Sequence, residues 1–270
     1  MSKYKIGEVA NILGIPNDTL RYYERRGIVT PQKDEETGYR YYDAWDLNFL
    51  LDSKWYRSFD FSVSDVVQMI NDDDRDAFLK RCVAHEFETL RVINEQKKRL
   101  DALVKYRHKV AQIMAQIGVF SLCARPPIIY QRHRYDYEYL LENGKASPAQ
   151  KWIDLMPYVF HTFVAQYFPE YEDSNKKEYY WGFSLSPEDA IEYGIELDAP
   201  CEYIHSAKSI YTVFCAGGRG TFMRDLHEKA ASKVAEMGYN ISGSMIGNLI
   251  VRLHEQGVFN RYFEVWIPVD

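Results

Sequence analysis

Residues 75–117 contain neither proline nor glycine, and this uninterrupted run constrains the fold more than any other feature of the sequence. The run ends at Gly118 and predicts one continuous helix of about forty residues, whereas globular helices average about twelve. A helix of this length either pairs with a partner helix or packs along a domain of its own chain.

The helix also carries an apolar seam at alternating spacings of four and three residues, the pattern of a coiled coil. Eight of its eleven positions are apolar, namely Leu79, Val83, Leu90, Ile93, Leu100, Val104, Ala111 and Met114, while Glu86, Lys97 and Arg107 fill the others. The length disfavours packing within one domain alone. We therefore expect a long antiparallel coiled coil that joins two chains into a homodimer.

Residues 5–70 show the signals of short helices separated by tight turns. The first helix is marked by Ile6, Val9, Ala10 and Leu13 at helical spacing, and Gly14 can end it. A second helix is expected to open with Asn17 or Asp18 as its N-cap and to end at Gly27. A helix, a tight turn and a helix is the arrangement that inserts a second helix into the major groove of DNA.

Two short extended runs around the Gly38 turn predict a hairpin, or wing, after the second helix. Asp43 is expected to cap a third helix that runs through Leu51. Ser62 and Asp65 resemble a capping box and begin a fourth helix. Together these signals predict a winged helix-turn-helix head.

A second folded region is expected after Pro126-Pro127. Its predicted elements are a strand over 128–136, a helix over 148–168, strands over 179–185 and 208–215, a helix over 220–237, and strands over 245–254 and 260–267. The order strand-helix-strand-strand occurs twice when the strand over 208–215 ends the first set and begins the second, which predicts two α+β pseudo-repeats that share a sheet. The chain is thus expected to be a multidomain α and α+β protein with a head over 1–74, a dimerisation helix over 75–120 and an α+β domain over 121–270.

Composition bears on the class of protein. No run approaches eighteen apolar residues and the start lacks a signal peptide, so we expect no membrane helix and a cytoplasmic location. The four cysteines form no C-x-x-C pair and are most simply buried apolar residues. The net charge of −6 speaks weakly against non-specific nucleic-acid binding, so the case for DNA depends on motif geometry.

Three ordered blocks in the head resemble the MerR family of bacterial transcription regulators. They are Ile6-Gly7-Glu8-Val9-Ala10, Thr19-Leu20-Arg21-Tyr22-Tyr23-Glu24 and Gly38-Tyr39-Arg40-Tyr41-Tyr42. The resemblance covers residues 4–117. It implies a dimer that binds a pseudo-palindromic operator in double-stranded promoter DNA and acts with RNA polymerase at the promoter. It also implies activation by untwisting and bending the DNA between promoter hexamers that lie too far apart.

Seven residues of the head are candidates for contact with DNA. Arg21, exposed on the second helix, can fork to a guanine edge or a phosphate, and tyrosines can contact phosphates and sugars. The resemblance adds Arg57, placed in the loop before the fourth helix, as a contact to the DNA backbone. The full set is Arg21, Tyr22, Tyr23, Tyr39, Arg40, Tyr41 and Arg57. The alternative for each of Tyr22, Tyr39 and Tyr41 is a half-buried core aromatic.

The C-terminal half looks like the GyrI-like effector-binding domain. The likeness lies in the order of elements and in the closing run Tyr262-Phe263-Glu264-Val265-Trp266-Ile267-Pro268-Val269. It implies that Glu264 accepts a hydrophobic, flat, cationic small molecule such as a drug. A carboxylate among aromatic side chains needs a positive partner, and aromatic faces attract cations. Drug-responsive members of the family carry a second acid where this chain has Asn248, so weaker selection for charge is expected. Alternatively, Glu264 points to water.

The remaining candidates for ligand contact are aromatic: Tyr262, Trp181, Tyr180, Phe183, Tyr193, Tyr211 and Phe214. Alternation along a strand lets either Trp181 and Phe183 or Tyr180 and Gly182 face a pocket, and the sequence does not choose. The likeness places Tyr193 in the pocket. Each of these residues is otherwise a structural aromatic.

Two other functions remain open at this stage. One alternative is a metal or redox sensor that uses Cys82 and Cys123, although no second cysteine lies near Cys123. A second alternative is the hydrolysis of small electrophiles, as suggested for some GyrI-like domains, with Glu264, Tyr262 and Trp181 as the residues involved. We expect a protein that is not an enzyme, with no catalytic residue, no metal site and no cofactor.

Overall fold

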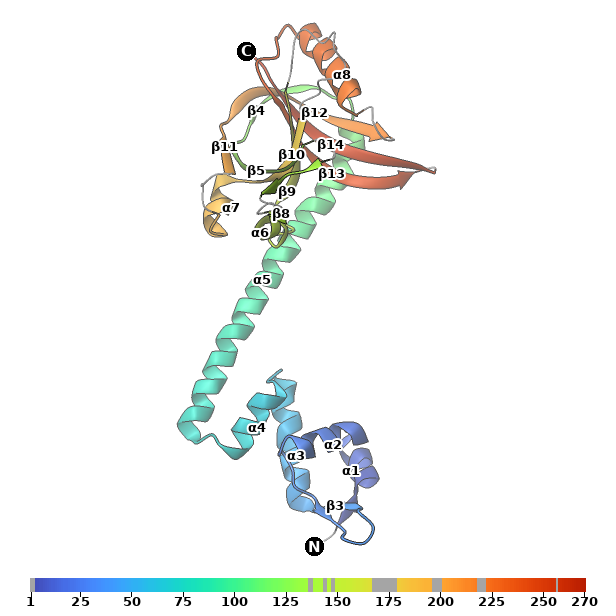
Figure 1. Ribbon diagram of the computed structural model, residues 1–270, viewed down its shortest axis with the longest axis vertical. Helices are drawn as coiled ribbons and strands as arrows, with labels where there is room; N and C mark the ends of the chain where they lie inside the picture. Colours follow the sequence, from blue (N-terminus) through green and yellow to red (C-terminus); the bar gives the residue numbers. More distant parts are fainter. Residues whose placement is uncertain are drawn as a thin grey trace. The chain divides into compact units, whose positions relative to one another are not determined.

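A computed structural model describes residues 3–135, 138–142, 145–146, 149–166, 179–195, 201–217, 222–255 and 257–270 of the chain. The chain divides into two compact units, Met1–Gln96 and Lys97–Asp270. The boundary falls inside helix α5 (Arg75–Gln116), which Figure 1 draws as one continuous ribbon and which confirms the predicted long helix. In the described parts of the chain, no helix is long and apolar enough to cross a membrane.

The first unit contains four short helices, the start of α5 and a small antiparallel sheet. The helices are α1 (Ile6–Leu13), α2 (Asn17–Arg25), α3 (Ala44–Ser58) and α4 (Val63–Asn71). The sheet has the order β1 (Tyr4–Lys5), β3 (Arg40–Tyr42), β2 (Gln32–Lys33). All of these helices contribute to one apolar core, which includes Val9, Leu20, Leu50 and Val66. The predicted helix-turn-helix and hairpin are confirmed, and β1 was not predicted.

The turn signals of this unit act as the sequence predicts. Gly14 follows α1 with φ of 62°, a left-handed conformation that favours glycine. Asp43 caps α3 by accepting hydrogen bonds from two backbone N–H groups of its first turn. Ser62 and Asp65 form the capping box that begins α4.

Two boundaries in the head differ from the prediction. The N-cap of α2 is Pro16, and neither Asn17 nor Asp18 caps the helix, because the fixed φ of proline already leads the chain into it. Helix α3 continues to Ser58 and does not end at Leu51, since neither glycine nor proline interrupts it.

The second unit is built on an antiparallel sheet that has nine strands within the described residues. Their order is β11 (Cys201–Ile204), β5 (Ile128–Tyr135), β10 (Tyr179–Leu185), β9 (Phe160–Ala165), β13 (Met245–Glu255), β14 (Val258–Pro268), β12 (Ala207–Gly217) and β4 (Ser121–Arg125), with β6 (Glu138–Tyr139) paired to β5. The strands β7 (Leu141–Glu142) and β8 (Lys145–Ala146) pair separately. The helices are α6 (Ala149–Ile153), α7 (Pro187–Glu192) and α8 (Phe222–Glu236). The sheet starts at β4, before Pro126-Pro127.

The predicted helix over 148–168 is wrong. Helix α6 has five residues, and strand β9 takes a central place in the sheet instead. Pro157 cannot donate the backbone hydrogen bond that a longer helix needs, and the run from Val159 to Ala165 is rich in β-branched and aromatic residues. Residues 167–168 lie outside the described residues. When the short strands β6, β7 and β8 and the elements α7 and β11 are left aside, the order of elements reads β5-α6-β9-β10 and β12-α8-β13-β14.

The two faces of the sheet pack against different helices. Phe263, Val265 and Ile267 of β14 share a core with α8, as strand alternation predicts. The opposite face meets the C-terminal part of α5, where Ile113 packs against Val213, Ile250 and Tyr262. Tyr262 and Glu264 therefore lie on the α5 side of the sheet.

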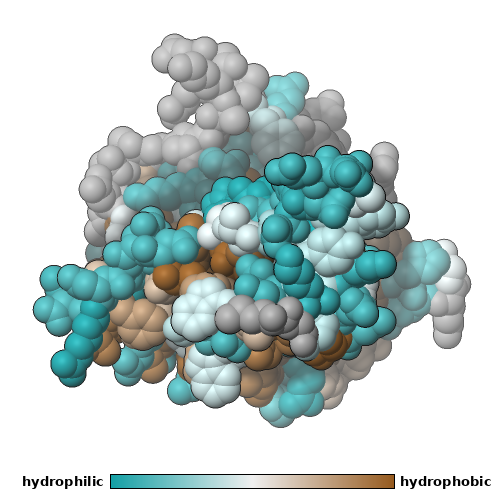
Figure 2. Space-filling view, turned by 90° about the horizontal axis from the view of Figure 1, so that it is seen from below, coloured by the Kyte–Doolittle hydropathy of each residue, from teal (hydrophilic) through white to brown (hydrophobic). Residues whose placement is uncertain are grey.

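Large apolar side chains are also exposed in the single chain. In the space-filling view, brown hydrophobic residues reach the surface between hydrophilic ones (Figure 2). Exposed aromatic residues of the first unit include Trp45, Trp55, Phe59 and Phe87. Exposed apolar surface on this scale is typical of a protein that binds a partner.

Candidate nucleic-acid interface and effector site

Helix α2 turns one face into the core of the head and the other outward. Leu20 and Tyr23 are buried, whereas the side chains of Arg21 and Tyr22 are exposed. Arg21 donates to the exposed carboxylate of Asp18 at 3.3 Å, a weak contact that leaves the guanidinium accessible. Two of the predicted DNA contacts on α2 thus lie at the surface, and Tyr23 belongs to the core.

The wing is attached to α2 through Glu24. Arg40 Nε donates to Glu24 Oε2 at 2.5 Å, and Lys33 Nζ lies 2.9 Å from Glu24 Oε1. Partial burial raises the pKa of Glu24, but the hydrogen bonds and charges of Arg40 and Lys33 outweigh it, so the pKa lies below its usual value. Part of the Arg40 guanidinium is therefore engaged within the head. Tyr39 stands exposed at the end of the wing, and Tyr41 is half-buried.

Arg57 lies in the last turn of α3 and not in a loop, which corrects the predicted position. The helix is longer than the sequence suggested, so this residue is still helical. Its guanidinium donates to the backbone carbonyl of Phe61, in the turn before α4. The structure thus places its charge at the α3–α4 corner.

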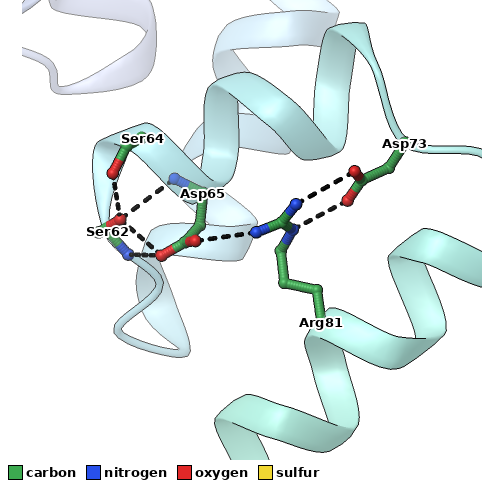
Figure 3. Close-up of polar contacts among 5 residues, drawn as sticks. All are labelled: Ser62, Ser64, Asp65, Asp73 and Arg81. Carbon is green, nitrogen blue, oxygen red and sulfur yellow. Dashed lines mark hydrogen bonds and ion pairs between the residues drawn. The ribbon is translucent and has the colours of Figure 1, made fainter.

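Sequence reasoning missed an ionic cluster that joins α4 to α5 (Figure 3). Arg81 of α5 donates to both carboxylate oxygens of Asp73, at 2.9 and 3.1 Å, and to Asp65 at 3.1 Å. The hydrogen bond from Arg81 lowers the pKa of Asp73, and the one from Ser62 lowers the pKa of Asp65. The three hydrogen bonds fix the direction in which α5 leaves the head. No periodic pattern connects these residues, so the sequence carries no signal for the cluster.

The second unit contains a buried carboxylate on the α5 side of the sheet. Glu264 on β14 is 3% exposed, so the alternative in which it points to water is wrong. Lys109 of α5 contacts both of its oxygens, at 2.8 Å for Oε1 and 2.7 Å for Oε2. Asn248 Nδ2 donates to Oε1 at 2.9 Å. The positive partner that such a carboxylate needs is present and belongs to the chain itself.

A chain of hydrogen bonds extends from Glu264 across the neighbouring strands. Thr162 donates its hydroxyl to Asn248 Oδ1 at 2.7 Å. A hydroxyl has one proton, so the contact between Ser184 and Thr162 is donated by Ser184. The chain orients the amide of Asn248 with its NH2 group on Glu264. The sequence did not reveal this set because Thr162 lay within the predicted helix over 148–168.

Lys109 belongs to a stripe of α5 residues that face the sheet. Tyr106 donates to the carbonyl of Ile250 at 3.0 Å, and Gln116 accepts a hydrogen bond from Tyr211 at 3.3 Å. Ile113 is buried between them. A signal for the stripe exists in the sequence, since Tyr106 and Ile113 are large side chains that lie outside the seam.

The predicted ligand residues do not form one cluster. Tyr262, Tyr211 and Tyr180 share the sheet face of Glu264, as register and alternation require. Trp181, Phe183 and Phe214 lie on the opposite face, in cores that involve α8 or α6. Tyr193 follows α7 and stacks on Tyr158, with ring centroids 5.1 Å apart.

The structure also shows where the two cysteines lie that suggested a metal or redox sensor. Cys82 packs against the core of the head, and Cys123 lies half-buried in β4. Within the described residues, no group of three or more His, Cys, Asp or Glu side chains is arranged to hold a metal ion.

A helix-turn-helix with an exposed second helix and an attached wing defines a class of DNA-binding proteins. The family model described as "MerR HTH family regulatory protein" matches residues 4–73. The chain is 30% identical to the mercuric resistance operon regulatory protein of Bacillus cereus over 96 residues, which are 36% of this chain and 72% of that protein. It therefore belongs to the MerR family and is a DNA-binding transcriptional regulator.

Two further relatives match a similar share of the chain. The HTH-type transcriptional regulator CueR of Escherichia coli O157:H7 is 31% identical over 109 residues, 39% of this chain and 76% of that protein. The HTH-type transcriptional activator TipA of Streptomyces coelicolor is 31% identical over 96 residues, 35% of this chain and 37% of that protein. All three alignments leave more than half of this chain unmatched.

Proposed function

We propose that the protein is a homodimeric activator that binds a pseudo-palindromic promoter and responds to a small molecule. The dimer is inferred from the two different faces of α5. In its C-terminal part, the stripe Tyr106, Lys109, Ile113 and Gln116 meets the sheet. Each of these residues follows a seam position by two residues, which is about 200° around a helix. The seam therefore points away from the sheet.

The apolar seam has the properties of an unpartnered coiled-coil face. Leu79, Val83, Leu90, Ile93, Leu100, Val104 and Met114 are all exposed in the single chain. A second copy of α5 covers such a face by inserting its own seam residues, and it sets two heads at a fixed spacing. One head reads half a site, so the dimer reads a site with two-fold symmetry.

The proposed DNA contacts are the surface residues of α2, the wing and the α3–α4 corner. Arg21 and Tyr22 enter the major groove, while Tyr39, Arg40, Tyr41 and Arg57 contact the flanking backbone. Tyr23 supports α2 from inside the core. The attachment of the wing to α2 through Glu24 supports this set, because it holds the two contact elements as one surface.

The proposed effector is a hydrophobic, planar, cationic compound bound on the sheet face of Glu264. A buried carboxylate selects a positive charge, and Tyr211 and Trp266, with ring centroids 5.6 Å apart, offer aromatic surface on the same face. The site adjoins α5, the helix that continues into the head, and this supports a route from effector to DNA.

In vitro transcription with RNA polymerase tests the function. The template carries a promoter whose hexamers are separated by an over-long spacer, because bending and untwisting can bring such hexamers into register. We expect the full-length protein to raise transcript yield, more strongly with a bound effector. The same promoter with an ordinary spacer is the control and should show no activation. Repression alone, under a panel of cationic and neutral aromatic compounds, would count against an activator.

A further inference from the structure

The two partners of the ion pair between Glu264 and Lys109 differ in their exposure to solvent: the carboxylate is buried and the ammonium is partly exposed. The side chain of Glu264 is 4% exposed, and that of Lys109 is 37% exposed. The Lys109 ammonium also lies 5.4 Å from the ring centroid of Phe160, within the range of a cation–π contact. One cation thus sits on a buried carboxylate beside an aromatic face, at the edge of solvent.

The carboxylate is the fixed half of this pair. The hydrogen-bond chain from Ser184 through Thr162 holds the amide of Asn248 with its NH2 group on Glu264 Oε1. This donor stays in place when the lysine leaves, because the contacts that orient it come from β9 and β10. Lys109, in contrast, reaches the site through a flexible four-carbon stem and can turn its ammonium into water.

A departure of Lys109 without replacement leaves a buried carboxylate with one hydrogen bond and no counter-charge, which is costly. A neutral compound cannot meet this cost. A compound with a positive charge beside a flat ring can, since it restores the charge on Glu264 and takes the place of the ammonium beside Phe160.

We propose that Lys109 is a built-in competitor for the effector, so that a cationic aromatic compound binds Glu264 by displacing the ammonium group of Lys109. The proposal rests on the proposed function, in which Glu264 contacts the effector. Displacement removes the charged contact in the middle of the stripe that holds α5 on the sheet, between Tyr106 and Ile113. Effector binding is thereby coupled to the helix that bears the dimer seam.

Calorimetric titration of the full-length protein at pH 8 tests the competition. The probes are N-methylacridinium, a permanent cation, and acridine, a neutral ring of nearly the same shape at this pH. Lys109→Met keeps the stem and removes the charge. We expect it to bind N-methylacridinium about ten-fold more tightly than the wild type, because no competing conformer is left, and to bind acridine unchanged. Lys109→Arg retains a cation and should keep the wild-type affinity.

Two further variants separate the possible failures. Lys105→Met removes an exposed lysine one turn away and should leave both affinities unchanged. Glu264→Gln should abolish the preference for the cation over acridine. If Lys109→Met binds the cation no more tightly than wild type while Glu264→Gln weakens it, competition by Lys109 is refuted and the effector site stands. If Glu264→Gln has no effect on the cation, or no form binds it, the proposed effector site is refuted as well. Circular dichroism establishes that each variant is folded, and a Lys109→Met/Glu264→Gln double variant removes both charges should the single one unfold.

Discussion

On α2, exposed residues lie next to buried ones, so substitutions that affect DNA recognition can be distinguished from substitutions that affect stability. The Arg21 side chain is half exposed and makes one weak contact, so Arg21→Ala should leave the fold intact. If Arg21 forks to a guanine, the change costs about 1–3 kcal/mol of binding and relaxes the base preference at that position. Gel-shift titration at a fixed salt concentration measures both effects.

Tyr22 and Tyr23 supply the internal control for this prediction. Tyr22→Phe removes a hydroxyl at the surface and should weaken binding without lowering the melting temperature. Tyr23→Ala should lower the melting temperature, because it removes a ring from the core. Unchanged affinity of both Arg21→Ala and Tyr22→Phe would mean that another surface reads the DNA.

Two histidines of the second unit, the buried His133 and the half-buried His161, make its stability depend on pH. His133 is 5% exposed, and its ring stacks on that of His161. Among the residues that the structure describes, neither ring nitrogen of His133 has a hydrogen-bond partner. Burial lowers the pKa of His133 to about 4 and that of His161 to about 3, and nearby positive charges, chiefly Arg134 for His133, add to the effect. Both rings are therefore neutral in the folded protein, whereas in the unfolded chain they bind protons below about pH 6.5.

The sign of the effect follows from this difference. As pH falls from about 6.5 to about 4, the unfolded state gains protons first, and the free energy of unfolding falls by up to about 1.4 kcal/mol per pH unit for His133. Between pH 7 and pH 5, the urea concentration at the midpoint of unfolding should fall less for His133→Phe than for the wild type. His205→Gln, an exposed histidine, is the matched control. An identical pH profile for His133→Phe and wild type would contradict the account.

At the scale of elements, the two-faced helix α5 gives a test of dimerisation. Leu90→Asp places a charge in the seam and should convert the dimer to a monomer, because a buried unpaired carboxylate is costly. Val92→Asp is the matched control, since Val92 is exposed but lies outside the seam. Light scattering at micromolar concentration measures the mass. A monomeric wild type, or equal dissociation of both variants, would rule out the seam as the interface.

Elements whose signals are local could be predicted from the sequence. The 75–117 run, the Asp43 cap and the strand over 179–185 each depend on residues close together in the chain, and the structure has them in place. The helix over 148–168 was wrong because periodicity alone does not separate a buried strand from a helix, and Pro157 was given too little weight. In the site, Glu264 was found as a lone acid among aromatics. Its partner Lys109 was not, since 155 residues separate them and nothing local connects a helix lysine to a distant strand.

At the scale of the whole molecule, α5 carries a charged contact in each unit, Arg81 in the first and Lys109 in the second. Arg81→Met removes the three hydrogen bonds that fix α5 to Asp65 of α4 and to Asp73 in the turn after it (Figure 3). Once one head has bound a symmetric site, the attachment of the second head sets its effective concentration at the other half-site. A less rigid attachment lowers this concentration. We expect weaker binding to a full site with unchanged binding to a half-site, measured by gel shift. Arg75→Met, at the exposed start of α5, is the control. Equal losses on both sites would indicate a damaged head.

A dimer with two DNA-reading heads should select DNA sites with two-fold symmetry. This can be measured by selecting binding sites from a random pool of double-stranded DNA with the full-length protein. We expect enrichment of one inverted repeat, with its half-sites on the same side of the duplex, and loss of the symmetric partner half-site in selections with Leu90→Asp. Enrichment of a single asymmetric half-site by the wild type, or of no sequence at all, would contradict it.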